Sequence, residues 1–169
     1  KLIPFFSTTI LFFVCIFCYF DMKSHLYSQE SRYYNDQNMP NELYASSIMA
    51  LNNYRTVDYA GTPLYYFTGI AKHKMGDIQS AKLLFQKARE IAPYHLGVLT
   101  NYMIVTAELG QLETAKSIME TIQRIYPLMA KPRLDMAKFY LQAGKIGEAE
   151  KILSKLKKDN LDDGDGTRE

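Results

Sequence analysis

The sequence predicts an all-α fold, in which an N-terminal transmembrane helix is followed by a solenoid of about three helix-turn-helix repeats. Two observations predict this fold. A run of 19 uncharged residues, 2–20, stands near the start of the chain. Further on, Gly76, Gly110 and Gly144 recur at a constant interval of 34 residues. A fixed period between about 20 and 50 residues is the signature of stacked repeats.

The composition is that of a globular protein with little net charge. The chain has 169 residues, of which 47% are hydrophobic and 22% are charged. Such a chain has room for about one domain and can bury a core. Its 20 Lys and Arg against 18 Asp and Glu leave a formal net charge of +2, which is too small for the clustered basic face of a nucleic-acid-binding protein. We therefore expect no nucleic-acid partner.

Residues 1–21 are predicted to form the transmembrane helix. The run LIPFFSTTILFFVCIFCYF lies between Lys1 and Asp21, and at about 1.5 Å per residue it covers the roughly 30 Å hydrocarbon core of a bilayer. It has neither the polar stripe of a buried helix nor the basic region and cleavage site of a removed signal peptide. We expect a membrane span, and an uncleaved signal anchor would be one form of such a span. Because the chain begins with Lys1 rather than methionine, we also expect further residues upstream.

Cysteines and histidines do not predict a metal or cofactor site. Cys15 and Cys18 have the spacing of a redox pair or of half a zinc site. They lie inside the apolar run, however, and no second pair completes a site, so ordinary membrane-helix cysteines are the favoured interpretation. His25, His73 and His95 have no metal-ligand spacing and are expected to be surface residues.

Residues 22–61 are predicted to be a juxtamembrane connector that contains one helix. The segment is polar and rich in tyrosine. Apolar residues at helical spacing in ELYASSIMAL, preceded by Pro40, predict a helix from about Asn41 to Tyr54. Because this segment does not keep the 34-residue period, we expect a connector or an irregular helix that covers the first repeat.

The rest of the chain divides into three repeats and a short tail. The repeats occupy 62–95, 96–129 and 130–160, and each contains two helices separated by one of the periodic glycines. A single pair of this size cannot cover its own apolar face, so neighbouring pairs stack. Residues 161–169 are expected to be a flexible tail. Their DDGDG stretch lacks the glutamate and the following helix of a calcium loop.

The first repeat illustrates how the helices are bounded. Thr62 is expected to cap the first helix, with Pro63 in its first turn. Gly76 should end that helix and Pro93 the second. Small residues should let the helices approach closely, and apolar residues at helical spacing should face the core. The small residues are Gly69, Ala81, Ala115 and Ala149, and the apolar ones are Leu83, Leu84, Ala88, Ile91, Ile118, Met119, Ile122, Ile125, Ile152, Leu153 and Leu156.

These repeats resemble the tetratricopeptide repeat (TPR). Counted from Thr62, the first repeat matches every position that this family favours, and the second and third match in part. The resemblance covers 62 to about 160 and implies a solenoid that binds other proteins. The matching residues of the first repeat are Tyr65, Gly69, Gly76, Ala81, Phe85, Ala88 and Pro93.

The TPR resemblance also implies a binding face. In this family the first helices of the repeats line a concave groove, which suits an extended peptide or a helix of a partner. A solvated inner face without a partner is the alternative. The mapped residues are Tyr66, Ile70, His73, Lys74, Thr100, Ile104, Glu108, Lys131, Leu134 and Lys138.

The clamp for a terminal carboxylate that some TPR proteins carry is not predicted. Its places are held here by Tyr66, Ile70, Asn101, Lys131 and Asp135. Only two of the five match, and Asp135 has the wrong charge for a carboxylate ligand. There is also no phosphate-binding glycine loop, no serine elbow and no recognisable carboxylate pair, so catalysis within this chain is not expected.

The whole arrangement resembles the C-terminal end of bacterial O-antigen ligase and polymerase-like membrane proteins. The resemblance is carried by the apolar span, the tyrosine-rich connector, AGTPLYYFTGIA at 60–71 and APYHLGVLTNY at 92–102. It implies an accessory tail of a multi-span enzyme acting on lipid-linked glycans in the bacterial inner membrane, with the repeats in the periplasm. No catalytic residue carries over, and a reaction centre would lie upstream. The alternative is a singly anchored scaffold for an envelope or secretion complex.

Overall fold

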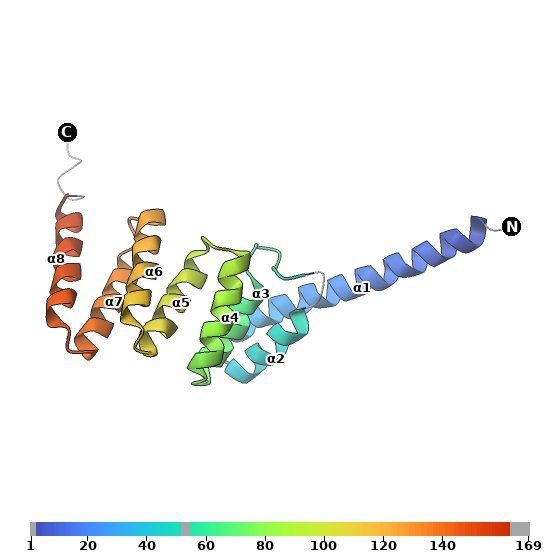
Figure 1. Cartoon of the computed structure of the whole chain (residues 1–169). Coiled ribbons are helices and arrows are strands. Elements are labelled where there is room, and N and C mark those ends of the chain that lie inside the picture. Colours follow the sequence, from blue (N-terminus) through green and yellow to red (C-terminus); the bar gives the residue numbers. More distant parts are fainter. Residues whose placement is uncertain (1–2, 52–54, 163–169) are drawn as a thin grey trace. The chain divides into compact units, whose positions relative to one another are not determined.

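The computed structural model describes residues 3–51 and 55–162, with side chains from 9 to 158. The described residues form eight helices and no strand, which confirms the predicted all-α fold. They fall into two compact units, Lys1–Ile91 and Ala92–Glu169. The helices are α1 (Ile3–Asp36), α2 (Pro40–Ala50), α3 (Leu64–Lys74), α4 (Ile78–Ile91), α5 (Leu96–Glu108), α6 (Leu112–Ile125), α7 (Ala130–Gln142) and α8 (Ile146–Asp162) (Figure 1).

The periodic glycines end the first helix of three helix pairs, α3–α4, α5–α6 and α7–α8. Gly76, Gly110 and Gly144 have φ values of +83°, +75° and +70°, which an L side chain rarely adopts. After α3 the amide of Gly76 donates to His73 O at 2.9 Å, and the amide of Asp77 donates to Lys72 O at 2.9 Å. This is the glycine-terminated helix end that the 34-residue period predicted.

Close approach within the α3–α4 pair depends on Gly69. A Cβ atom at this position would lie 2.8 Å from a ring carbon of Phe85 on α4. Phe85 is fully buried, as are Ala81 and Ala88 on the same helix. The prediction that small residues allow the helices to touch is therefore confirmed for this pair.

The predicted apolar faces are only partly buried. Ile118, Met119 and Ile122 on α6 are buried as expected. The prediction that Leu83 faces the core is wrong, because its side chain is 61% exposed. The buried stripe of α4 passes through Ala81, which lies about 200° away from Leu83 around the helix. The other predicted core residues found exposed are Ile91 and Leu153, while Leu84, Ile125 and Ile152 are half-buried and Ala88 and Leu156 are buried.

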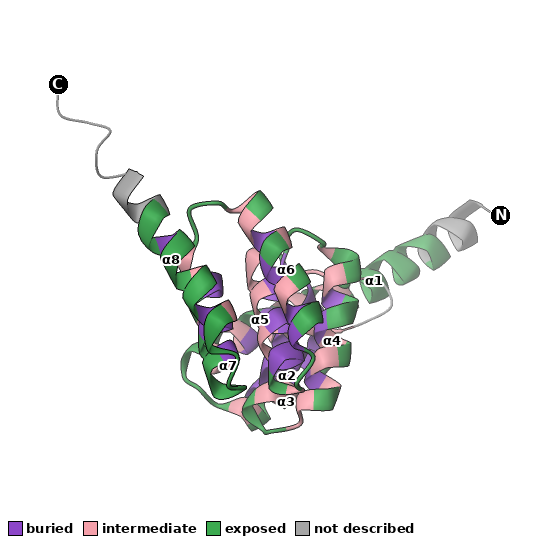
Figure 2. Ribbon diagram, turned by 60° about the vertical axis from the view of Figure 1, so that its left-hand side comes forward, coloured by how far each residue is buried: buried purple, intermediate pink, exposed green. Residues whose placement is uncertain are grey.

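Helix α1 does not end with the apolar run. The sequence predicted a transmembrane helix over 1–21, but α1 continues to Asp36. Residues 22–39 contain no glycine or proline, so nothing interrupts the helix until Asn38 takes a φ of +57°. The part of α1 from Thr9 is long and apolar enough to cross a membrane, by length and composition. Figure 2 shows its described N-terminal turns as exposed.

The second half of α1 packs against α2, in the region predicted to be a connector. The interface contains several small polar residues: the Oγ atoms of Ser31 and Ser46 are 2.9 Å apart, and Ser24 Oγ donates to Ala50 O. The predicted helix from Asn41 to Tyr54 corresponds to α2, which ends at Ala50; its expected last residues, 52–54, lie outside the described part. The buried serines are Ser24, Ser28, Ser31, Ser46 and Ser47.

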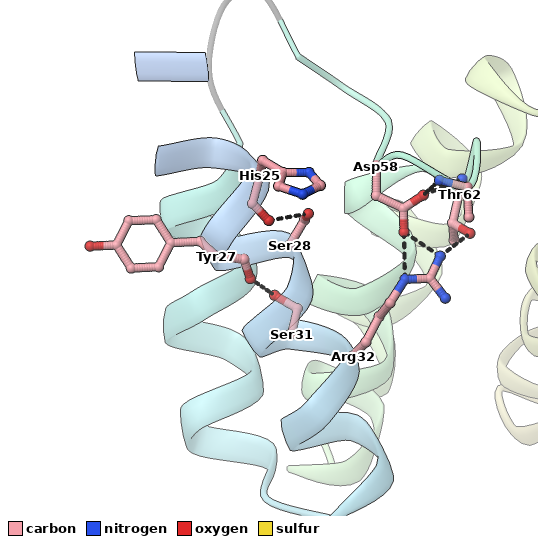
Figure 3. Close-up of polar contacts among 8 residues, drawn as sticks. His25, Tyr27, Ser28, Ser31, Arg32, Asp58 and Thr62 are labelled. Carbon is pink, nitrogen blue, oxygen red and sulfur yellow. Dashed lines mark hydrogen bonds and ion pairs between the residues drawn. The ribbon is translucent and has the colours of Figure 1, made fainter. Parts of the chain in front are cut away.

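A buried ion pair fixes the loop that leads from α2 to α3. The Asp58 side chain is fully buried and pairs with Arg32 of α1 (Figure 3). Asp58 Oδ1 also accepts from the amides of Ala60 at 2.9 Å and Thr62 at 2.8 Å. Thr62 does not cap α3 as predicted, because Pro63 stands at the cap position and Thr62 Oγ1 accepts instead from Arg32 Nη2 at 3.0 Å.

Candidate functional site

The second unit contains a hollow between α5 and α7, on the face that the TPR resemblance assigned to a partner. The hollow has a volume of about 320 Å³. Ile104 reaches it from α5, and the remaining lining residues come from one face of α7. They are Lys131, Asp135, Lys138, Phe139 and Gln142.

A second hollow of about 340 Å³ continues the first one towards the α5–α6 turn. The two share Phe139 and Gln142. Glu108 and Gly110 line the far end of the second hollow. Together the two hollows form one elongated depression beside α7, which we call the α7 groove.

The α7 groove combines an apolar wall with charged groups. Ile104 and Phe139 are half-buried and supply the wall. Asp135 has a side chain that is only 16% exposed, and its Oδ1 lies 3.5 Å from Nζ of Lys138, which is 72% exposed. The Asp135 Oδ2 atom is buried and has no hydrogen-bond partner among the described residues. A buried acceptor of this kind is stabilised by a donor brought in by a ligand.

The predicted groove residues of the second unit are divided between the groove and its surroundings. Ile104, Glu108, Lys131 and Lys138 line it. Thr100 on α5 and Leu134 on α7 are not among its lining residues; Thr100 is half-buried and Leu134 is exposed.

In the first hollow, three lining residues were missed by the reasoning from sequence. Asp135 was considered only as an argument against the carboxylate clamp, and Phe139 and Gln142 were not considered. All three share a helical face with Lys131, since they follow it by four, eight and eleven residues. Extending the predicted face along α7 at this spacing would have found them.

The predicted groove residues of the first unit make contacts within that unit. Ile70 is buried. The ring of Tyr66 lies against Phe85, with centroids 6.1 Å apart. Lys74 Nζ lies 3.2 Å from both the backbone oxygen and the Oδ1 atom of Asn35, near the end of α1. His73 is half-buried.

Another hollow, of about 260 Å³, lies between α6 and α8 and has mixed charge. Lys116 Nζ and Glu148 Oε2 are 3.7 Å apart across it. The buried Arg133 contributes a cation from α7, and its Nη2 donates to Pro127 O at 3.3 Å. Because cations and carboxylates alternate here, the surface has no single electrostatic preference for a ligand.

No histidine or cysteine is among the lining residues of the α7 groove. His95 caps α5, where its Nδ1 accepts from the amide of Val98 at 3.2 Å. The His25 Nε2 atom lies 3.0 Å from Nε2 of Gln29. Cys15 and Cys18 are free and exposed on α1. Among the residues whose placement is described, no three His, Cys, Asp or Glu side chains form a group that could hold a metal ion.

Comparison with known proteins supports the repeat fold. Residues 107–166 match the family model described as a tetratricopeptide repeat, so the chain contains a TPR. A crystal structure of MamA, a TPR protein, is similar over 79% of this chain and 77% of its own, with 21% identity and a TM-score of 0.66. Another MamA structure covers 82% and 74%, with 20% identity and a TM-score of 0.69.

A further similar structure is MamA from residue 41 to its end, from Desulfovibrio magneticus RS-1. It covers 86% of this chain and 98% of its own, with 15% identity and a TM-score of 0.52. At these identities the likeness concerns the fold. No curated protein matches the chain. The comparisons give no support to the resemblance to O-antigen ligases.

Proposed function

We propose that this chain is a membrane-anchored protein-interaction module that holds a segment of a partner protein in the α7 groove. TPR domains generally act by binding other proteins, and the match over 107–166 covers α6, α7 and α8. The observation that carries the proposal is the α7 groove itself, with an apolar wall, a buried carboxylate oxygen and exposed lysines.

The chemistry of the groove defines the partner segment. An apolar side chain of the partner would pack on Ile104 and Phe139. A backbone amide or a side-chain donor would satisfy Asp135 Oδ2, and acidic side chains would face Lys131 and Lys138 at the rim. Because Asp135 and Glu108 line the groove as well as the two lysines, the occupant is an amphipathic stretch of polypeptide, extended or helical, with acidic side chains only where it faces the lysines.

The anchoring part of the proposal rests on α1. The side chains from Ile10 to Phe20 are exposed, although they include phenylalanine, isoleucine and leucine. An exposed apolar helix of this length is stabilised by lipid. We propose the bacterial inner membrane as the location and the periplasm as the side that holds the repeats, as the resemblance of the sequence to O-antigen ligases implied. Protection of the repeats from protease added to intact spheroplasts would place them on the cytoplasmic side instead.

Two forms of the anchored module differ in what precedes it. In the singly anchored scaffold, α1 is the one membrane span of the protein; in the ligase-type tail, further spans precede it. We favour the scaffold, because the resemblance to ligases finds no support among the similar structures. The mass of the native protein in its own membranes distinguishes the two. A band near 19.5 kDa supports the scaffold, and a band several times heavier supports the tail.

The α7 groove is tested by comparing matched charge reversals. The double variant Lys131→Glu, Lys138→Glu reverses two rim charges, and the control Lys157→Glu, Lys158→Glu makes the same change at exposed positions of α8. Proteins captured from detergent-solubilised membranes are quantified for both variants. We expect a partner that the control retains and the rim variant loses.

A photo-crosslinking residue at Gln142 reports whether that partner occupies the groove. A crosslink to the same partner is expected, because Gln142 lines both hollows. Equal capture by the rim and control variants, with no crosslink from position 142, would refute the assignment of the groove.

A further inference from the structure

We infer that the first unit also rests on the bilayer surface, beside its anchor. The contact is made by four exposed apolar side chains at about the same height on the outer faces of the two helices, which we call the interfacial patch: Met22 and Leu26 on α1 and Ile48 and Met49 on α2. The ligand of this patch is the headgroup layer of the lipid. This inference deepens the proposed function and rests on its claim that α1 spans a membrane.

Two side-chain contacts hold the end of α2 level with the end of the apolar run. Ser24 Oγ on α1 donates to the carbonyl oxygen of Ala50, the last residue of α2. Arg55, a few residues later, donates from Nε to Asp21 Oδ1 at 2.9 Å and from Nη2 to Asp21 Oδ2 at 3.0 Å. The C-terminal end of α2 therefore lies beside residues 21–24 of α1.

This level corresponds to the headgroup layer. Ser24 follows Phe20 by four residues, or about 6 Å along a helix. The polar layer on each side of the hydrocarbon core is roughly 5–8 Å thick. Met49 directly precedes Ala50 on the antiparallel helix, so it lies about 7.5 Å beyond Phe20, within the headgroup layer.

The exposed face of α2 changes polarity in the direction that this placement requires. At its start, remote from the apolar run, the exposed residues are Asn41 and Glu42. At its end they are Ile48 and Met49, and the Met49 side chain is 57% exposed. An exposed apolar pair at one end of an otherwise polar face indicates a surface that water does not cover.

Helix α1 shows the same change, read in the opposite chain direction. Met22 and Leu26 are exposed apolar residues just after the run, whereas the exposed residues further along α1 are the polar Gln29 and Asp36 and the amphipathic Tyr33. The Ser31–Ser46 and Ser24–Ala50 contacts show that α1 and α2 are antiparallel. The two polarity gradients therefore coincide in space.

An aromatic residue and a lysine mark the same height. Lys23 Nζ lies 4.9 Å from the ring centroid of Tyr19, and both side chains are exposed. Tyrosine and lysine at the end of a span are typical of the membrane–water interface, where the ring is amphipathic and the ammonium group reaches the headgroups.

The absence of tryptophan from the chain allows a direct test by fluorescence. Three single variants of the full chain, Met49→Trp, Asn41→Trp and Phe12→Trp, are reconstituted into phosphatidylcholine–phosphatidylglycerol vesicles. Some of these vesicles contain phospholipid brominated near the headgroup end of the acyl chains, and others contain phospholipid brominated near the far end of the chains, in the middle of the bilayer. We expect several-fold stronger quenching by bromine for Met49→Trp than for Asn41→Trp, which lies on the same helix.

Phe12→Trp, inside the apolar run, separates this inference from the proposed function. If Phe12→Trp is quenched and Met49→Trp is not, the span stands and the interfacial patch is refuted. A blue-shifted but unquenched Met49→Trp would mean that protein covers the patch, which refutes it as well. If Phe12→Trp is not quenched in any vesicle, the membrane anchoring of the proposed function is refuted, and the interfacial patch is refuted with it.

Discussion

Substitution of Gly69 by alanine tests the contact on which the α3–α4 pair is built. The added Cβ atom would lie 2.8 Å, 2.9 Å and 3.1 Å from three ring carbons of Phe85. The ring cannot move away freely, because Phe85 is fully buried and Tyr66 packs against it. We therefore expect Gly69→Ala to destabilise the chain, although alanine is the better helix former.

The magnitude follows from two opposing terms. Overpacking of a well-packed core costs about 1–3 kcal/mol. Replacement of a mid-helix glycine by alanine contributes about 1 kcal/mol in the opposite direction. The free energy of unfolding should therefore fall by up to about 2 kcal/mol, with a central value near 1 kcal/mol. The gain in helix propensity alone would give a rise instead.

Gly147 provides the matched control. It also lies in a helix, α8, and no atom within 4 Å would meet a Cβ there. Gly147→Ala should raise the free energy of unfolding by up to about 1 kcal/mol. Urea unfolding of both variants in mild detergent, followed by circular dichroism, measures the difference. If Gly69→Ala stabilises the chain as much as Gly147→Ala does, the proposed close packing against Phe85 is wrong.

Three further substitutions follow from the described contacts. Gly110→Ala should cost about 1–2 kcal/mol in urea unfolding, because φ at this position is +75°. Arg32→Met leaves the buried Asp58 carboxylate without its partner and should cost about 3–5 kcal/mol, whereas Arg55→Met, at a more exposed pair, should cost about 1 kcal/mol or less. Burial raises the pKa of Tyr140 above its usual value, so its native state holds the phenolic proton more tightly than the unfolded state. Stability should therefore be unaffected below about pH 10 and fall as the pH rises towards the native pKa, and a pH series on Tyr140→Phe should show a smaller alkaline loss.

The repeat fold could be predicted from sequence because its determinants are local and periodic. A positive φ at the end of a helix strongly favours glycine. The positions of Gly76, Gly110 and Gly144 therefore indicate directly where each helix pair turns. The helices of a pair touch where side chains are small, and Gly69 and Ala81 record that contact in the same way. Such positions leave a residue-type signal that needs no knowledge of the partner element.

The packing of α1 on α2 left no such signal. Prediction of a buried helix face relies on apolar residues at a spacing of three and four, and this interface buries serines instead. Each hydroxyl finds an acceptor close by, as when Ser28 Oγ donates to His25 O at 2.7 Å and Ser31 Oγ donates to Tyr27 O at 2.8 Å (Figure 3). A buried polar residue with a local partner costs little. Residues 22–36 were therefore interpreted as a polar connector, and the continuation of α1 through them was missed.

The candidate site was predictable in outline only. The mapping from the TPR pattern identified Ile104, Lys131 and Lys138, because these positions follow from the repeat register alone. It could not identify the role of Asp135, whose Oδ2 atom is buried by the packing of the second unit. Burial of one oxygen depends on the side chains around it, and a repeat pattern does not encode them.

The continuity of α1 has a consequence for the proposed anchoring of the first unit in a membrane. A flexible linker after the span would let the repeats turn freely, because glycine- or serine-rich segments behave as random coils. Here the helix is uninterrupted from Ile3 to Asp36, and it is tied to the following chain by the Arg55–Asp21 pair near the apolar run and by the Arg32–Asp58 pair about three turns further on. Two ties spaced along one helix resist both rotation and bending of α2 and its loop about α1. A change in the tilt of the span would therefore be transmitted to the first helix pair, and the interfacial patch would enter or leave the headgroup layer with it.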